Sequence, residues 1–243
     1  MYSASGPLSQ KPSIDRLKPA LGLKGIELDD ITMVGERKRQ DIRGEPCVGW
    51  LHIFDSLATT YMVNTKQEER KLNGFWRTLI ANTAGYPPQL LPKGSHPLGA
   101  PFAKRFFIKL EDGLGREWLS RAKRFAAMLD GIWDREAREA ASWTAFDEPY
   151  VFCRCLRLFR TDKGYLGLGT ECLGPGDEVW IVPGSRVPLI LWRLKGDSSS
   201  PGRHRLVGGT YLHGVMEGGG VSPSVTGLTA EEVEASMEPL VLL

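Results

Sequence analysis

The chain is poor in the residues on which many enzyme and metal sites depend, with four histidines and four cysteines among 243 residues. Its 31 lysines and arginines nearly balance 29 acidic residues, which excludes a general attraction to nucleic acid or to a membrane surface. The longest apolar runs, 187–192 and 240–243, are far too short to cross a bilayer. The polar, proline-punctuated first residues lack the apolar core of a signal peptide. A cytoplasmic protein is therefore expected.

The cysteines are too few and too irregularly spaced for a disulfide framework. They are Cys47, Cys153, Cys155 and Cys172. Cys153 and Cys155 lie two apart in a β-like run, which predicts that both point to one face of a strand. A structural metal site would need further ligands at a partnering spacing, which Cys172 alone does not supply. No metal and no cofactor are expected.

The first half of the chain is predicted to be mainly helical. Residues 1–18 read as a flexible tail with little to bury. An apolar stripe over residues 48–63 predicts a helix, and the capping box at Thr65–Glu68 predicts the start of a second helix that ends before Gly85. A long helical pattern follows over 114–142. Residues 48–145 are thus expected to form a helical insert of about three helices.

In the second half of the chain, the apolar residues alternate with the two-residue period that is typical of β-strands. Turns predicted at 162–164, 174–177 and 183–185 separate short apolar runs, a spacing typical of a small antiparallel β-barrel over 150–218. The segment 21–35 also reads as strand, bent at Asp29–Asp30, and it is expected to join that barrel because a lone strand leaves its backbone groups unpaired. The fold class is therefore α+β, a single unit over 19–225. Residues 226–243 are expected to form a tail with a short helix capped by Thr229 and Glu232.

No catalytic constellation emerges. The glycines between 164 and 176 match neither the dinucleotide loop, which a helix must follow, nor the P-loop, which ends in Gly-Lys-Ser/Thr. Asp177, His213 and Glu217 could form an acid–base set at a barrel mouth, but nothing in the sequence places them together. His204 lies in a polar stretch and is expected to be exposed. Ser185 lacks the context of a nucleophile elbow.

Six stretches carry a family resemblance, and they occur in the family's order. The chain resembles the C-terminal region of fungal heterokaryon-incompatibility (HET) proteins. The matching stretches are KGIELDDI (24–31), FWRTLIAN (75–82), GYLGLG (164–169), GDEVWIVPG (176–184), VPLILWR (187–193) and LVGGTYLHGVMEG (206–218). Thr170 stands where the family often has proline. Gly209 stands where it has glutamate, which puts any family role of that carboxylate in doubt.

The resemblance implies a role rather than a reaction. In such proteins the HET domain itself, thought to be related to TIR-like folds and to trigger cell death, lies upstream and has no counterpart here. A truncated paralogue, a partial gene model or a fragment is therefore expected. The expected role is that of a non-enzymatic module acting in allorecognition, or regulating incompatibility cell death by autoinhibition or ligand sensing. Its expected partner is a HET-domain effector or a relative.

Two alternatives belong to other functional classes. A small-ligand-binding protein or hydrolytic enzyme would use a barrel mouth. The residues expected to line that mouth are Tyr165, Asp177, Trp180, Tyr211 and His213. A nucleic-acid binder is disfavoured by the balanced charge.

Overall fold

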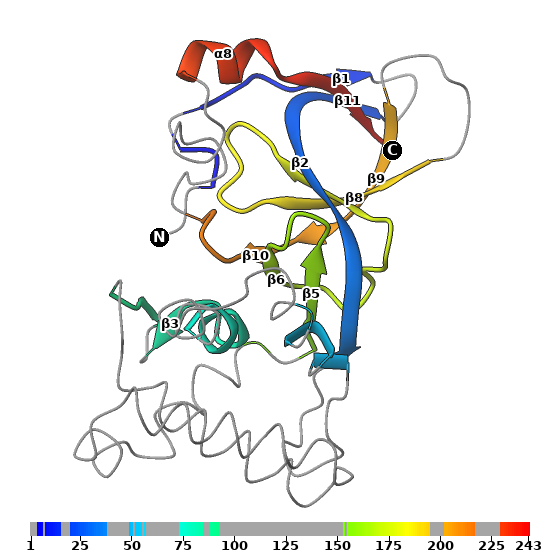
Figure 1. Ribbon diagram of the computed structural model, residues 1–243. Coiled ribbons are helices and arrows are strands. Elements are labelled where there is room, and N and C mark those ends of the chain that lie inside the picture. The colour runs from blue at the N-terminus through cyan, green and yellow to red at the C-terminus, as the bar shows by residue number, and fades with distance from the viewer. Residues whose placement is uncertain are drawn as a thin grey trace, which may run out of the picture. The chain divides into compact units, whose positions relative to one another are not determined.

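The computed structural model of the chain divides into two compact units (Figure 1). The first unit comprises Met1–Val34 and Arg157–Leu243, and the second comprises Gly35–Leu156. The structure describes residues 4–6, 8–15, 20–37, 49–50, 52–54, 56, 73–84, 88–92, 153, 155–194, 202–216 and 229–243. Over these residues the chain is mostly β, with short helical stretches.

A sheet of nine described strands builds the first unit. Its strands are β1 (Ser13–Asp15), β2 (Ala20–Arg37), β5 (Arg157–Thr161), β6 (Leu166–Gly169), β7 (Glu178–Ile181), β8 (Leu189–Arg193), β9 (Gly202–Gly209), β10 (Tyr211–Leu212) and β11 (Glu238–Leu242). Neighbours run in the order β10-β6-β5-β2-β11-β9-β8-β7, and β1 pairs with β2. β2 pairs with β11, β11 with β9, β9 with β8, and β8 with β7. Because β7 also pairs with β2, this series of pairings begins and ends at β2.

The long strand β2 joins the early part of the chain to the late strands. Leu23 lies opposite Leu240 of β11, and Ile26 lies opposite Ile181 of β7. The register shifts between Glu27 and Asp29, next to the predicted bend. A bulge of this kind bends a strand without ending it, so the bent segment forms one continuous strand. The predicted pairing of this early segment with the later strands is confirmed.

The ends of the chain are more ordered than the predicted tails. β1 pairs with the start of β2, and Ala4 is buried. Thr229 and Glu232 form the predicted capping box at the start of helix α8 (Ala230–Ala235). β11 then follows as an unpredicted strand between β2 and β9. Its apolar run of four residues was too short to read as a strand by itself, but Leu240 is fully buried in the sheet.

Two separate cores lie on opposite faces of β7 and β8. Successive side chains of a strand point to opposite faces, so Val179 and Ile181 belong to a larger core while Trp180 and Val182 belong to a smaller one. The larger core also contains Leu28, Ile31, Phe159, Leu173, Ile190, Leu212, Val215 and Val233, and the smaller core contains Leu191 and Leu240. Burial on both faces explains why this stretch reads as a continuous apolar run.

Two predicted strands differ in their limits. In the region predicted to begin the barrel, at residue 150, the strand β5 begins only at Arg157, and Cys155 just before it has a left-handed backbone with φ of 65°. Cys153 is therefore buried and Cys155 half-buried, without the shared strand face that was expected. The last apolar run of the predicted barrel, residues 205–214, forms two strands that are divided at Thr210, whose hydroxyl donates a hydrogen bond to Leu168 O (3.0 Å). β9 pairs with β8, and β10 pairs with β6.

The second unit contains the described helical residues 49–50, 52–54, 56 and 73–79. Phe75, Trp76 and Leu79 are buried, as their spacing predicted. Left-handed backbone at Ala81 and Asn82 follows the second helix, and a small hairpin of β3 (Thr83–Ala84) and β4 (Gln89–Leu90) comes next. The capping box predicted at 65–68 and the helix predicted at 114–142 lie outside the described residues. None of the described helices combines the length and the hydropathy that a membrane span requires.

Candidate functional site

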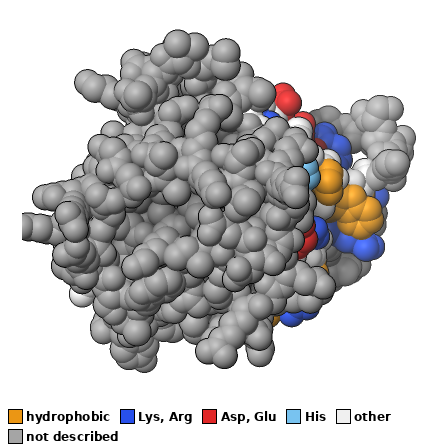
Figure 2. Space-filling model, turned by 60° about the horizontal axis from the view of Figure 1, so that its bottom comes forward, with side chains coloured by type: hydrophobic (Ala, Val, Ile, Leu, Met, Phe, Trp, Pro, Cys, Tyr) orange, Lys and Arg blue, Asp and Glu red, His pale blue; other side chains and the backbone are white. Residues whose placement is uncertain are grey.

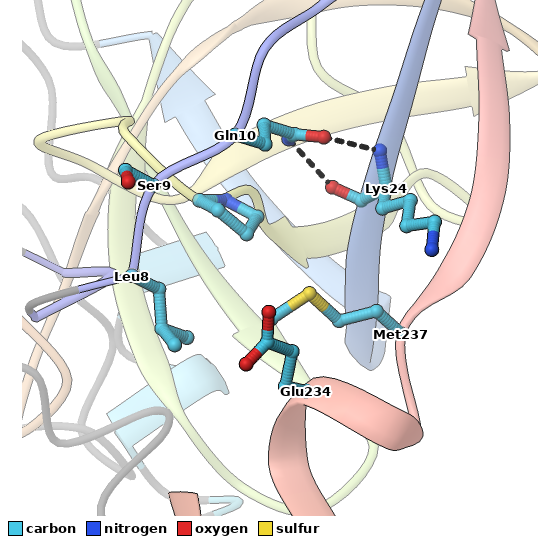
Figure 3. Close-up of a pocket in the computed structure, with 7 residues that line it drawn as sticks. Leu8, Ser9, Gln10, Lys24, Glu234 and Met237 are labelled. Carbon is cyan, nitrogen blue, oxygen red and sulfur yellow. Dashed lines mark hydrogen bonds between the residues drawn. The ribbon is translucent and has the colours of Figure 1, made fainter. Parts of the chain in front are cut away.

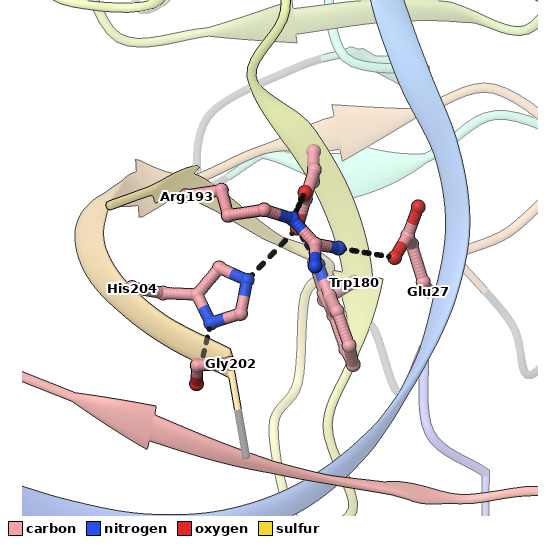
Figure 4. A network of polar contacts seen from close by, with 6 residues as sticks. Glu27, Trp180, Arg193, Gly202 and His204 are labelled. Carbon is pink, nitrogen blue, oxygen red and sulfur yellow. Dashed lines mark hydrogen bonds and ion pairs between the residues drawn. The ribbon is translucent and has the colours of Figure 1, made fainter. Parts of the chain in front are cut away.

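A polar network lies on four strands of the first unit, centred on Glu178 of β7 (Figure 4). The Glu178 carboxylate, whose side chain is only 6% exposed, accepts a hydrogen bond from the Trp180 indole (Nε1–Oε2 2.8 Å). It contacts His204 of β9 at 3.0 Å (Nε2–Oε2) and forms an ion pair with Arg193 Nε of β8. Arg193 also donates to Glu27 of β2 (2.9 Å). One carboxylate thus has three nitrogen partners.

Strand register explains how residues distant in the sequence meet here. Arg193 and His204 are directly opposite each other across β8 and β9, and Glu178 lies opposite Leu191, two positions before Arg193. Residues two apart on a strand share a face, and directly paired residues of an antiparallel ladder also share one. The alternation of β7 places Trp180 on this same face.

Both ring nitrogens of His204 lie within hydrogen-bond distance of an oxygen atom. Nε2 faces the Glu178 carboxylate, and Nδ1 lies 3.1 Å from the carbonyl oxygen of Gly202. These two contacts fix the orientation of the imidazole ring inside the unit.

Three carboxyl groups crowd around the single guanidinium of Arg193. One carboxylate oxygen from each of Glu27, Asp30 and Glu178 lies within 4.8 Å of the others. Burial, and then the negative charge of Glu178, raise the pKa of both Glu27 and Asp30, although Arg193 opposes this. The hydrogen bond to Glu178 in turn raises the pKa of Arg193. Such oxygens could also hold a hard cation, but Arg193 already contacts two of the three.

The side chains of this network are poorly accessible to a substrate. The His204 side chain is 2% exposed, so the two groups best suited to acid–base chemistry, His204 and Glu178, face each other inside the protein. Their partners come from β2, β7, β8 and β9. The arrangement therefore ties these strands together by charge-assisted hydrogen bonds.

The expectation that His204 is exposed was wrong. His204 lies between exposed Arg203 and Arg205 on β9, and the alternation of the strand turns the histidine inward. The pattern Arg-His-Arg before an apolar pair carried this signal. It was missed because the polar loop before it was taken to continue through residue 204.

The five residues predicted to line a barrel mouth have different surroundings in the structure. The Tyr211 hydroxyl and His213 Nδ1 are 2.9 Å apart, whereas Trp180 contacts Glu178 and His204. Tyr165 packs against the larger core. Asp177 is buried and accepts the N–H of Gly174 (2.8 Å); burial raises its pKa and this hydrogen bond opposes the rise. A common mouth remains a prediction.

A pocket of about 270 Å³ lies elsewhere in the first unit (Figure 3). It is lined by Leu8, Ser9, Gln10, Lys24, Pro183, Glu234 and Met237, and by none of the five predicted residues. The Gln10 side chain bonds the backbone N–H and carbonyl of Lys24 at 2.7 and 2.8 Å, which fixes one wall. Lys24 and Glu234 bring opposite charges to the pocket.

An exposed aromatic and basic surface follows β8 and β9. Trp192 is 49% exposed, and the Arg205 guanidinium lies 5.8 Å from the centroid of its ring. Arg203 and Leu206 are also exposed. Figure 2 shows hydrophobic side chains beside lysine and arginine side chains on the described part of the face in view. Nothing in the sequence motifs singled out this surface.

Comparison with known proteins places the chain in a family context. It is 24% identical to heterokaryon incompatibility protein 6, OR allele, of Neurospora crassa, across 89% of this chain and 34% of that protein. Residues 124–223 match the Het-6 β-barrel domain. The chain is related to fungal heterokaryon-incompatibility proteins. This HET relative spans about a third of the length of the curated protein that it matches. No solved structure matches it.

Proposed function

We propose that this HET relative is a non-enzymatic module that acts through protein contacts, either in allorecognition or in the regulation of incompatibility cell death. The observation that carries this proposal is the relationship to heterokaryon incompatibility protein 6 across 89% of the chain. The partner would be a HET-domain effector or a relative, met in the cytoplasm. We further propose that β7, β8 and β9, which lie within the matched residues 124–223, form a barrel together with β2 and β11 from outside the match.

The distribution of reactive groups supports a binding role. Glu178 and His204 are buried and bonded to each other, while large apolar and basic side chains on β8 and β9 face solvent. Buried charges in such a network hold strands in place, and exposed tryptophan and arginine are the residues that most often dominate protein interfaces. The chemistry of this unit is therefore better suited to recognition than to turnover.

Co-expression tests the proposal. The tagged chain would be produced in Neurospora crassa together with the full-length OR-allele protein, with complex formation followed by co-precipitation and cell death by vital staining after hyphal fusion. The proposal predicts a complex and a changed fraction of dead fusion cells. An unchanged fraction without any complex would contradict it.

A ligand-binding role is the second candidate, because the pocket between Leu8 and Met237 approaches the size of small-molecule sites. The opposite charges of Lys24 and Glu234, which both line the pocket, favour a small zwitterion. Thermal denaturation with a panel of free amino acids tests this role. A rise in melting temperature that is abolished by Lys24→Met and Glu234→Gln would support it, and no rise at millimolar concentrations would oppose it.

A further inference from the structure

We propose that the surface formed by Trp192, Arg203 and Arg205 binds an acidic segment of a protein partner. We call it the Trp192 surface. This inference rests on the proposed function, because it names the contact through which the module would act. It concerns one face of β8 and β9 in the first unit.

Strand geometry brings the three side chains together. Trp192 lies directly opposite Arg205 in the antiparallel ladder of β8 and β9, so the two share a face. Arg203 lies two positions before Arg205 and points the same way. His204, between them, points to the other face and is bonded to Glu178. The network therefore fixes the strand that presents the two arginines.

Among the residues that the structure describes, no acidic side chain is paired with the two arginines of this surface. β8 and β9 contain Arg193, Arg203 and Arg205 and no acidic residue. Arg193 is paired with Glu27 and Glu178. In the part of the chain that the structure describes, Arg203 and Arg205 have no carboxylate partner. Two guanidinium groups held on one strand face fit the carboxylates of a partner, which arginine can bind through two parallel hydrogen bonds.

The aromatic ring adds a second element of recognition. The Arg205 guanidinium lies over the face of Trp192, so the two side chains hold each other in place by a cation–π contact. Half of the Trp192 side chain remains in contact with water. An apolar residue of the partner would cover this area. The expected ligand is thus an acidic segment with an aromatic or aliphatic side chain.

A protein ligand fits better than a nucleic acid. Affinity for nucleic acid depends largely on the number of phosphates that lysine and arginine neutralise, and this surface offers two arginines beside a half-exposed tryptophan. The chain as a whole has a net charge of only +2. Arginine and tryptophan are instead the residues enriched at the centre of protein interfaces.

Fluorescence anisotropy with the purified full chain tests the proposal. The probe is a fluorescein-labelled decapeptide of alternating Glu-Asp and Leu-Phe pairs, compared with its Gln/Asn counterpart and with a labelled ten-nucleotide single-stranded DNA. Trp192→Ala and the double variant R203Q/R205Q are each expected to weaken binding of the acidic probe at least tenfold. The matched control K11Q/R186Q removes two exposed positive charges elsewhere and is expected to bind within twofold of the unaltered chain.

Several outcomes would overturn the proposal. These are no binding of the acidic probe at 1 mM, equal binding of the Gln/Asn probe, or equal loss in K11Q/R186Q. Tighter binding of the DNA that depends on Arg203 and Arg205 would make the surface a nucleic-acid site instead. Circular dichroism and melting temperature would verify that each variant is folded.

Co-precipitation of the same variants with the full-length OR-allele protein separates this inference from the proposed function. A complex that survives Trp192→Ala and R203Q/R205Q unchanged leaves the proposed function standing and refutes the Trp192 surface. If the unaltered chain forms no complex and changes no cell death, the proposed function itself fails.

Discussion

His204 and Glu178, 26 positions apart in the sequence, meet at 3.0 Å between Nε2 and Oε2 on the shared face of β7, β8 and β9. The contact joins a central strand to the strand that carries Arg203 and Arg205 on its other face. A buried polar network whose members all have hydrogen-bond partners makes the arrangement of its strands rigid. The pair therefore links the interior of the unit to its exposed recognition surface.

Removing the charge of Glu178 should destabilise the protein strongly. In Glu178→Gln the Arg193 and His204 side chains lose their shared carboxylate, and breaking one partner of a buried pair costs about 3–5 kcal/mol. Urea unfolding followed by tryptophan fluorescence measures the loss. The control Glu238→Gln removes an exposed carboxylate of β11 and should change the free energy of unfolding by less than about 0.5 kcal/mol. Similar losses in both variants would show that the network is unimportant.

Gly167 is required by the packing of the β5–β6 hairpin. It lies directly opposite Phe159, and a Cβ atom at this position would overlap the Phe159 ring. Gly167→Ala should therefore cost about 1–3 kcal/mol through overpacking of the larger core. Gly174→Ala is the matched control, because a Cβ atom there meets nothing within 4 Å. Equal melting temperatures of the two variants would contradict this packing.

The C-terminal strand should contribute substantially to stability. Leu240 of β11 is fully buried in the smaller core, whereas Leu243 is exposed. Leu240→Ala is expected to lower the free energy of unfolding by about 2–5 kcal/mol, the usual cost of a cavity in a core. Leu243→Ala should stay within about 0.5 kcal/mol of the unaltered chain. If both changes were small, β11 could not lie between β2 and β9 in solution.

Asp30 provides a prediction about pH. Burial, followed by the charge of Glu178, raises its pKa in the folded protein. A carboxyl group with a raised pKa favours the folded state while it is protonated and loses that contribution as pH rises through the folded value. Asp30→Asn should therefore stabilise the protein at pH 7 and have little effect near pH 3. Urea midpoints at the two pH values measure this, and a variant less stable at pH 7 than the unaltered chain would refute the direction.

The sequence correctly predicted the elements that depend on a few residues close together in the chain. The turn at 162–164, the turn at 174–177 and the capping box at Thr229 each depend on a few neighbouring residues, and each is found in the structure. The family relationship was also visible, because its motifs recur in order along the chain. These features require no knowledge of what the strands pack against.

The features that the sequence did not reveal depend on contacts between distant segments. β11 looks like an apolar tail until β2 and β9 are placed on either side of it. The inward orientation of His204 depends on its register with Arg193, and Trp192, which lies opposite Arg205 in the same ladder, is 49% exposed. None of these could be derived from spacing or composition alone.

Oxidative footprinting of tryptophan in the presence of the full-length OR-allele protein tests the central claim most directly. In the free chain Trp192 should be oxidised readily, while buried Trp180 provides an internal reference that reacts slowly. The proposal predicts that complex formation slows the oxidation of Trp192 at least fivefold and leaves Trp180 unchanged. A complex in which Trp192 is oxidised as fast as in the free chain would contradict the claim that this surface makes the contact.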